Sequence, residues 1–164
     1  MSPRVVVMEL ARLEAAHLLG LVQQFAELVE DSAPDDSDPA VLRLVPDAYD
    51  DQKAAQEFRD LTAGDLLQRR RADAAVVADT LADVAPISDD PADPALHAQV
   101  QIRLDPERAR AWMRTLAAIR LVLATRLGIA QPEDDDPDDP RFGIYHWLGY
   151  RLDGLVEAIG DPQQ

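Results

Sequence analysis

The stretch 100–128, VQIRLDPERARAWMRTLAAIRLVLATRLG, carries the clearest helix signals in the chain and limits what the rest of it can fold into. Asp105 is a preferred N-cap residue, Pro106 suits the first helical position, and Gly128 suits the left-handed conformation in which many helices end. The predicted helix is about 33 Å long at 1.5 Å per residue. Its apolar residues recur at spacings of three and four, which places one face in a core. They are Ala109, Trp112, Leu116, Ile119, Leu123 and Leu127.

The beginning of the chain repeats this arrangement of a strand and a helix. Residues 4–10, RVVVMEL, predict a strand, and residues 12–30 predict a helix that is apolar nearly all round. A helix of that kind is buried or lies in a dimer interface. The similarity between the two strand–helix units is explained equally well by chance and by a duplication. Because two short strands satisfy their backbone groups by pairing, we expect a ribbon of residues 4–10 and 99–104, joined near Val6 and Gln101, with both long helices packed on one side.

The remaining patterns predict shorter helices separated by acidic loops. The predicted helices cover residues 40–44, 53–61, 64–84 and 141–159, and the acidic loops cover residues 31–38, 86–96 and 130–139. Thr62, with Asp65 three residues later, is a capping-box-like start that separates the second and third of these helices. The stripe expected on the last helix is Ile144, Leu148, Leu152, Leu155 and Ile159. The prediction is a mainly α single domain over residues 1–164, a bundle of about five to six helices with a short two-stranded ribbon.

The composition of the chain excludes several classes of protein and several kinds of functional site. The chain has 164 residues and no cysteine. This is the length of a single domain that can bury a sufficient hydrophobic core without disulfides or structural metal ions. Disulfides, thiolate metal sites and cysteine nucleophiles are therefore excluded. No apolar run is long enough to span a membrane and no signal-peptide pattern is present, so we expect a cytoplasmic protein. The net charge of −15 opposes non-specific binding to nucleic acid or to an anionic membrane, because phosphate neutralisation needs a basic surface.

The chain contains no recognisable catalytic, cofactor or metal motif. It has no nucleophile elbow, phosphate-binding loop or dinucleotide-binding glycine pattern, so neither catalysis nor a cofactor is expected. Asp134, Asp136 and Asp138 have the first spacings of a calcium loop, but Asp139 stands in place of the required glycine and Tyr145 in place of the final glutamate. No metal site is therefore predicted.

Structural roles are the favoured interpretation for the three histidines and for a run of three arginines. His17, His97 and His146 are scattered, and for His146 we expect a hydrogen-bonded ring on the last helix. Residues 69–71 are three arginines, which on a helix fan through about 200° and cannot form one nucleic-acid-binding surface. At least one of them should lie beside the buried stripe and pair with a carboxylate.

Four stretches resemble segments of the actinobacterial domain-of-unknown-function family numbered two thousand and seventeen. They are DPAVLRLVPDAY at 38–49, EFRDLT at 57–62, IRLVLATRLGI at 119–129 and YHWLGYRLDGLV at 145–156. Their order and spacing agree across essentially the whole chain. Ala124 stands where the family often has glycine, and residues 151–153 differ from its usual run, but neither departure breaks the pattern.

The resemblance implies a set of neighbouring genes rather than a catalytic activity, because no catalytic residue is established for that family. Its members are commonly encoded beside the ClpS protease adaptor, a JAMM-type metallopeptidase, a ubiquitin-like sulfur carrier and cysteine synthase, and some are labelled transcriptional regulators. The matched segments contain polar or aromatic residues that a simple core does not need: Arg43, Tyr49, Glu57, Arg59, Arg120 and Arg126. These residues form either a structural ion-pair network or a pocket or docking surface for which they are the anchors.

Together these observations favour a non-enzymatic interaction or regulatory module with a protein partner. The resemblance links it to Clp proteolysis or to sulfur-carrier and cysteine metabolism. A homodimer is compatible with the apolar first helix. The alternatives are a transcriptional regulator, which the net charge argues against, and an enzyme with a pocket around Arg43, Glu57 and Arg59.

Overall fold

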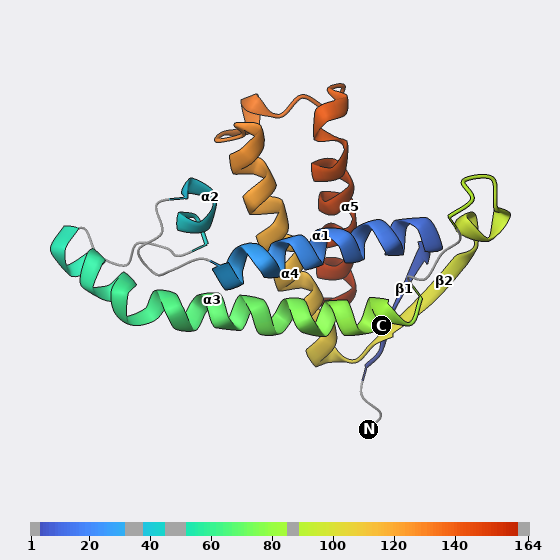
Figure 1. Cartoon of the computed structure of the whole chain (residues 1–164), viewed down its shortest axis with the longest axis horizontal. Helices are drawn as coiled ribbons and strands as arrows, with labels where there is room; N and C mark the ends of the chain where they lie inside the picture. Colours follow the sequence, from blue (N-terminus) through green and yellow to red (C-terminus); the bar gives the residue numbers. More distant parts are fainter. Residues whose placement is uncertain (1–3, 32–37, 45–51, 85–88, 161–164) are drawn as a thin grey trace.

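The computed structural model describes residues 4–31, 38–44, 52–84 and 89–160, and for residues 31, 42 and 52–64 it describes the backbone only. These residues form five α-helices and a two-stranded antiparallel sheet (Figure 1). In chain order the elements are β1 Val6–Ala11, α1 Arg12–Asp31, α2 Pro39–Leu42, α3 Gln52–Ala82, β2 Gln99–Leu104, α4 Pro106–Leu127 and α5 Gly143–Gly160, with short 3-10 turns at Pro94–His97, Pro132–Asp134 and Pro140–Phe142. The prediction of a mainly helical fold with one short ribbon is confirmed.

The ribbon pairs the two segments that the sequence pattern brought together. Val6 lies opposite Leu104 and Glu9 lies opposite Gln101 in an antiparallel register. One face of the ribbon is buried in the core and carries Met8, Leu10, Ile102 and Leu104. The predicted ribbon is therefore confirmed.

The helices form two antiparallel pairs that cross each other. α1 and α3 lie side by side, and α4 and α5 form the second pair, which runs across the first (Figure 1). α2 packs on α4. α1 and α4 contact each other less than either contacts α3, so the two long helices of the strand–helix units are joined largely through α3. Among the described helices, none combines the length and the hydropathy that a membrane crossing needs.

The capping signals at both ends of α4 act as predicted. The side chain of Asp105 accepts a hydrogen bond of 2.8 Å from the N–H of Arg108. Gly128 has a φ of 78°, the left-handed conformation that glycine adopts without a Cβ penalty. Four of the six residues expected in the buried stripe are buried, and Leu123 and Leu127 are half-buried.

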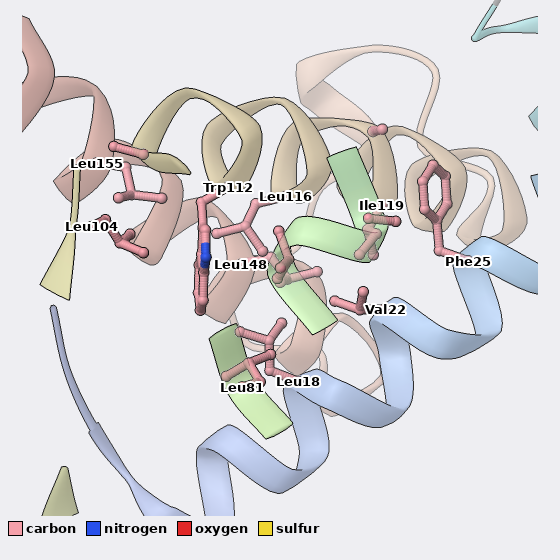
Figure 2. Packing of buried hydrophobic residues seen from close by; sticks show 14 of the residues in the cluster. Leu18, Val22, Phe25, Leu81, Leu104, Trp112, Leu116, Ile119, Leu148 and Leu155 are labelled. Carbon is pink, nitrogen blue, oxygen red and sulfur yellow. The ribbon is translucent and has the colours of Figure 1, made fainter. Parts of the chain in front are cut away.

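The core lies where the two helix pairs meet the inner face of the ribbon (Figure 2). Its largest fully buried side chain is that of Trp112. The same cluster contains Leu18 of α1, Leu81 of α3 and Leu148 of α5. Because each long helix contributes to one cluster, the four helices are held together by a shared apolar core.

The prediction of separate helices over residues 53–61 and 64–84 is wrong. The chain continues through residues 62–64 as the single helix α3. Neither Thr62 nor Gly64 removes a backbone donor, and a glycine in a helix interior costs only about 1 kcal/mol relative to alanine. Packing of one long helix on both α1 and α4 outweighs a cost of that size.

The stripe predicted for the last helix is correct except at its first residue. Its buried and partly buried members are Leu148, Leu152, Leu155 and Ile159. Ile144, by contrast, is 53% exposed. Ile144 lies in the first turn of α5, directly after the 3-10 turn Pro140–Phe142 through which the chain enters the helix. Phe142 is the residue that is buried at this end.

Candidate functional site

Two of the arginines that the sequence singled out line one pocket of about 510 Å³. Arg43 directly follows α2, and Arg120 lies in the second half of α4; we call this space the arginine pocket. Its other lining residues come from α4, the segment after it and α5: Ala117, Leu121, Ala124, Ile129, Ala130, Gln131, Pro132, Asp135, Tyr145 and Leu152. The wall thus combines two cations with a largely apolar lining.

The guanidinium of Arg120 is held in place by α5. Its central carbon lies 4.0 Å from the centroid of the Tyr145 ring, and its Nε donates a hydrogen bond of 3.3 Å to the backbone carbonyl of Tyr145. Gly149 makes this approach possible, because a Cβ at that position would lie 3.0 Å from the Nε of Arg120. Stacking on an aromatic face orients the guanidinium and leaves the N–H groups on its edge able to donate.

Arg43 and Arg120 have no carboxylate partner among the described residues. The Nη1 of Arg43 donates to the hydroxyl of Thr125 at 2.9 Å, and that hydroxyl donates to the carbonyl of Leu121 at 3.2 Å. The chain has 31 acidic residues against 16 basic ones, so carboxylates are abundant. Two arginines that share a pocket without one retain N–H groups that can bind an anion.

Asp135, the carboxylate among the lining residues of the pocket, is bound to a histidine instead. The Nε2 of His146 lies 2.5 Å from the Oδ1 of Asp135. The prediction of a hydrogen-bonded ring at His146 is therefore confirmed, whereas His17 and His97 are exposed. Asp135 does not form an ion pair with either arginine of the pocket.

Arg126 lies outside the lining of the pocket and joins α4 to α2. Its two terminal nitrogens donate to the two carboxylate oxygens of Asp38 at 2.9 and 2.7 Å, across 88 residues of sequence. Asp38 is also the N-cap of α2, since its side chain accepts a hydrogen bond of 2.9 Å from the N–H of Ala40. The ion pair fixes the start of α2 on α4 and thereby positions Arg43 at the other end of that short helix.

The side chains of the other three candidate residues lie outside what the structure describes. Tyr49 belongs to residues 45–51, and the side chains of Glu57 and Arg59 belong to the part of α3 for which only the backbone is described. The structure brings Arg43 and Arg120 together in one pocket and gives Arg126 an ion pair. A role for Tyr49, Glu57 and Arg59 stays a prediction.

The carboxyl of Asp38 should titrate below the usual range for aspartate. Hydrogen bonds from Arg126, and then from the N–H of Ala40, lower its pKa. In an Arg126→Gln variant we expect the Asp38 pKa to rise toward its ordinary value of about 3.9, measured from the pH dependence of the side-chain carboxyl ¹³C shift. The control is Arg110→Gln, which removes an exposed arginine from the same helix. An Asp38 pKa that is equal in wild type and Arg126→Gln would contradict the ion pair.

A second polar cluster, which the sequence reasoning missed, joins α1 to α5. The Oε2 of Glu14 accepts hydrogen bonds from the indole Nε1 of Trp147 at 2.8 Å and from Arg151 at 3.1 Å. The Oε1 of Glu14 accepts a bond of 3.1 Å from the N–H of Ala11, as in half of a capping box. A glutamate near the start of a helix was the available signal, but its partners lie 133 and 137 residues away. The cluster borders a groove of about 680 Å³ between α1 and the start of α5.

The aspartates of the 130–139 loop bind backbone groups of that same loop. The Oδ2 of Asp134 accepts hydrogen bonds of 3.0 Å from the N–H groups of Ala130 and Gln131. The side chain of Asp136 accepts one of 3.0 Å from the N–H of Asp138. Within the described ranges, no three potential metal ligands come together in one group. These aspartates thus shape the loop.

For the arginine run 69–71, the predicted burial of one arginine is observed but the predicted ion pair is not. Arg70 is half-buried and its two neighbours are exposed, so one of the three does lie beside the buried face of α3. The expected ion pair is wrong, since none of the three pairs with a carboxylate in the described part of the chain. Asp73, which lies one turn after Arg70, instead binds Arg114 of α4 at 2.9 and 3.0 Å.

The whole chain matches one known protein family. The family DUF2017, described as a domain of unknown function, matches residues 1–159. The matched region includes all four stretches on which the resemblance rested, and the resemblance is confirmed. Neither the curated proteins nor the solved structures gave a significant match. The chain therefore belongs to the DUF2017 family.

Proposed function

We propose that this protein is a non-catalytic interaction module that binds a carboxylate-bearing segment of a protein partner in the arginine pocket. The observation that carries the proposal is the pair Arg43 and Arg120, which line one pocket and have no carboxylate partner among the described residues. A guanidinium presents its N–H donors in a planar fork that matches the two oxygens of a carboxylate.

The size and lining of the pocket support an occupant with one acidic group and an apolar neighbour. A volume of about 510 Å³ lies within the range of roughly 300–1,000 Å³ that is usual for ligand pockets. It accommodates a chain end or one long side chain rather than a folded surface. Leu121, Ile129 and Leu152 give an aliphatic group a place to be buried. Because the chain carries a net charge of −15, a single carboxylate is favoured over a polyanion.

The two alternative functions have no comparable observation in their favour. A transcriptional regulator needs a basic face, but Arg114 and Arg126 of α4 are bound to the chain's own Asp73 and Asp38. An enzyme built around Arg43, Glu57 and Arg59 rests on two side chains outside the described residues. An interaction module is therefore the function that we propose.

The proposal extends to the pathway of the partner. It places the partner in Clp proteolysis or in sulfur-carrier and cysteine metabolism, because the family resemblance implies gene neighbours from both. The ClpS adaptor and the ubiquitin-like sulfur carrier are therefore the first purified proteins to test. Each should be titrated against wild type and Arg43→Gln by calorimetry, and we expect one of them to bind at least tenfold more weakly to the variant, about 1.4 kcal/mol.

The carboxylate requirement is tested with N-acetyl-Ala-Leu and its C-terminal amide, which differ only in the acidic group. We expect the free acid, but not the amide, to shift the Nε–H signal of Arg120 saturably in a ¹H–¹⁵N spectrum. Arg43→Gln should weaken this binding at least tenfold, and Arg110→Gln should leave it unchanged because Arg110 is exposed on α4 away from the pocket lining. Equal shifts from acid and amide, or none from either, would overturn the proposed site.

A further inference from the structure

We propose that the unpaired edge of β1, together with the groove between β1 and α5, binds an extended basic segment of another protein as an added third strand. This site shares no residue with the arginine pocket and does not depend on the function proposed above. Strand addition of this kind takes its affinity from main-chain hydrogen bonds and its specificity from alternate side chains.

The groove follows the edge of β1 rather than one of its faces. It has a volume of about 340 Å³ and is lined by the four consecutive residues 6–9 of β1. Successive side chains of a strand point to opposite faces, so a space that contacts four in a row runs along the edge. In the described sheet β1 pairs with β2 alone, which leaves the backbone donors and acceptors of its other edge without a strand partner.

The wall of the groove that α5 forms leaves room opposite this edge. The lining residues of α5 include Gly154 and Ala158, one turn apart. No heavy atom lies within 4 Å of the position that a Cβ of Gly154 would take. The lining also includes Tyr150, which is 70% exposed, and Val7 of β1, which is 50% exposed. These two side chains offer apolar contacts to alternate residues of an added strand.

The charges along the groove select a basic occupant. Glu9, Asp153 and Glu157 line it, and none of the three pairs with a basic side chain among the described residues. Arg151, the basic residue of the lining, is already bound to Glu14 at 3.1 Å. A second copy of this chain is disfavoured, because it would bring a net charge of −15 and a second Glu9 to the same edge. An alternating basic and apolar segment fits both the charges and the strand geometry.

The test uses the full chain and the synthetic peptide Ac-KVKVKV-NH2, followed by calorimetry and amide shifts. We expect the amide signals of residues 6–9 to move, no binding of Ac-EVEVEV-NH2, and at least a tenfold loss when the valine nitrogens of the basic peptide are methylated. Gly154→Leu, which fills the groove, should weaken binding at least tenfold. Gly20→Leu is the matched control and should bind as wild type, since its Cβ position is also open and it lines another groove.

A second variant keeps the proposal falsifiable if Gly154→Leu fails to fold. Glu157 is exposed, so Glu157→Lys changes the charge of the groove without entering the core, and it should weaken binding of the basic peptide several-fold. Equal binding by wild type and both variants would overturn the proposal, as would equal binding of the methylated peptide. A dimer in sedimentation that Gly154→Leu converts to monomer would also overturn it, because a second copy would then be the occupant.

Discussion

Trp112→Ala should lower the free energy of unfolding by about 3–5 kcal/mol, the largest effect that we expect from a single substitution. The Trp112 side chain is fully buried and shares the central cluster with residues of α1, α3 and α5 (Figure 2). Removing it leaves a cavity that four crossing helices cannot close without moving relative to one another. Since a domain has only about 5–15 kcal/mol of stability in total, a large fraction would be lost.

Trp112→Phe separates the loss of volume from the loss of the indole group. The Nε1 of Trp112 is buried and has no hydrogen-bond partner among the described residues, so phenylalanine removes an unsatisfied donor while keeping an aromatic ring. We expect Trp112→Phe to cost less than half of what Trp112→Ala costs, measured by urea unfolding followed by circular dichroism. Tyr150→Ala, at a 70% exposed position, should stay within about 0.5 kcal/mol of wild type. Equal losses of unfolding free energy in Trp112→Ala and Tyr150→Ala would contradict the placement of Trp112 in the centre of the core.

The features that the sequence predicted correctly are those that local physical chemistry determines. The N-cap at Asp105 and the left-handed end at Gly128 depend on residues within one turn, and both are observed. The ribbon could be predicted because both strands are short, and each needs a partner for its backbone groups. The exact register was not predicted: the ribbon was expected to join near Val6 and Gln101, whereas Val6 lies opposite Leu104 and Gln101 lies opposite Glu9.

The features that the sequence did not predict depend on residues far apart in the chain. The continuity of α3 through Gly64 depends on packing against two other helices, which no local propensity contains. Arg126 was a candidate for an ion pair, but its partner Asp38 lies 88 residues away in an acidic loop with several equivalent carboxylates. The pocket between Arg43 and Arg120 exists because α2 and α5 both pack on α4, an arrangement that periodicity does not reveal.

Glu14→Ala should cost about 2 kcal/mol, the typical contribution of hydrogen bonds that involve charged groups. Its carboxylate accepts hydrogen bonds from three donors, one at the end of β1 and two on α5. Without it, the half-buried guanidinium of Arg151 loses its carboxylate, and in the described part of the chain its Nε already has no hydrogen-bond partner. Glu27→Ala, at an exposed position of the same helix, is the control and should stay within about 0.5 kcal/mol of wild type.

The contribution of Glu14 should also depend on pH in a defined direction. Burial raises the pKa of Glu14, but hydrogen bonds from Ala11, Arg151 and Trp147 together outweigh it and lower the pKa. A carboxyl with a lower pKa in the folded state stabilises the fold above its unfolded pKa of about 4.3, and this contribution is lost as the pH falls through the folded pKa. The stability difference between wild type and Glu14→Gln should therefore be full at neutral pH and shrink in acid. A stability difference that grows on acidification would contradict this, because it would mean that burial outweighs the hydrogen bonds and raises the pKa of Glu14 in the folded protein.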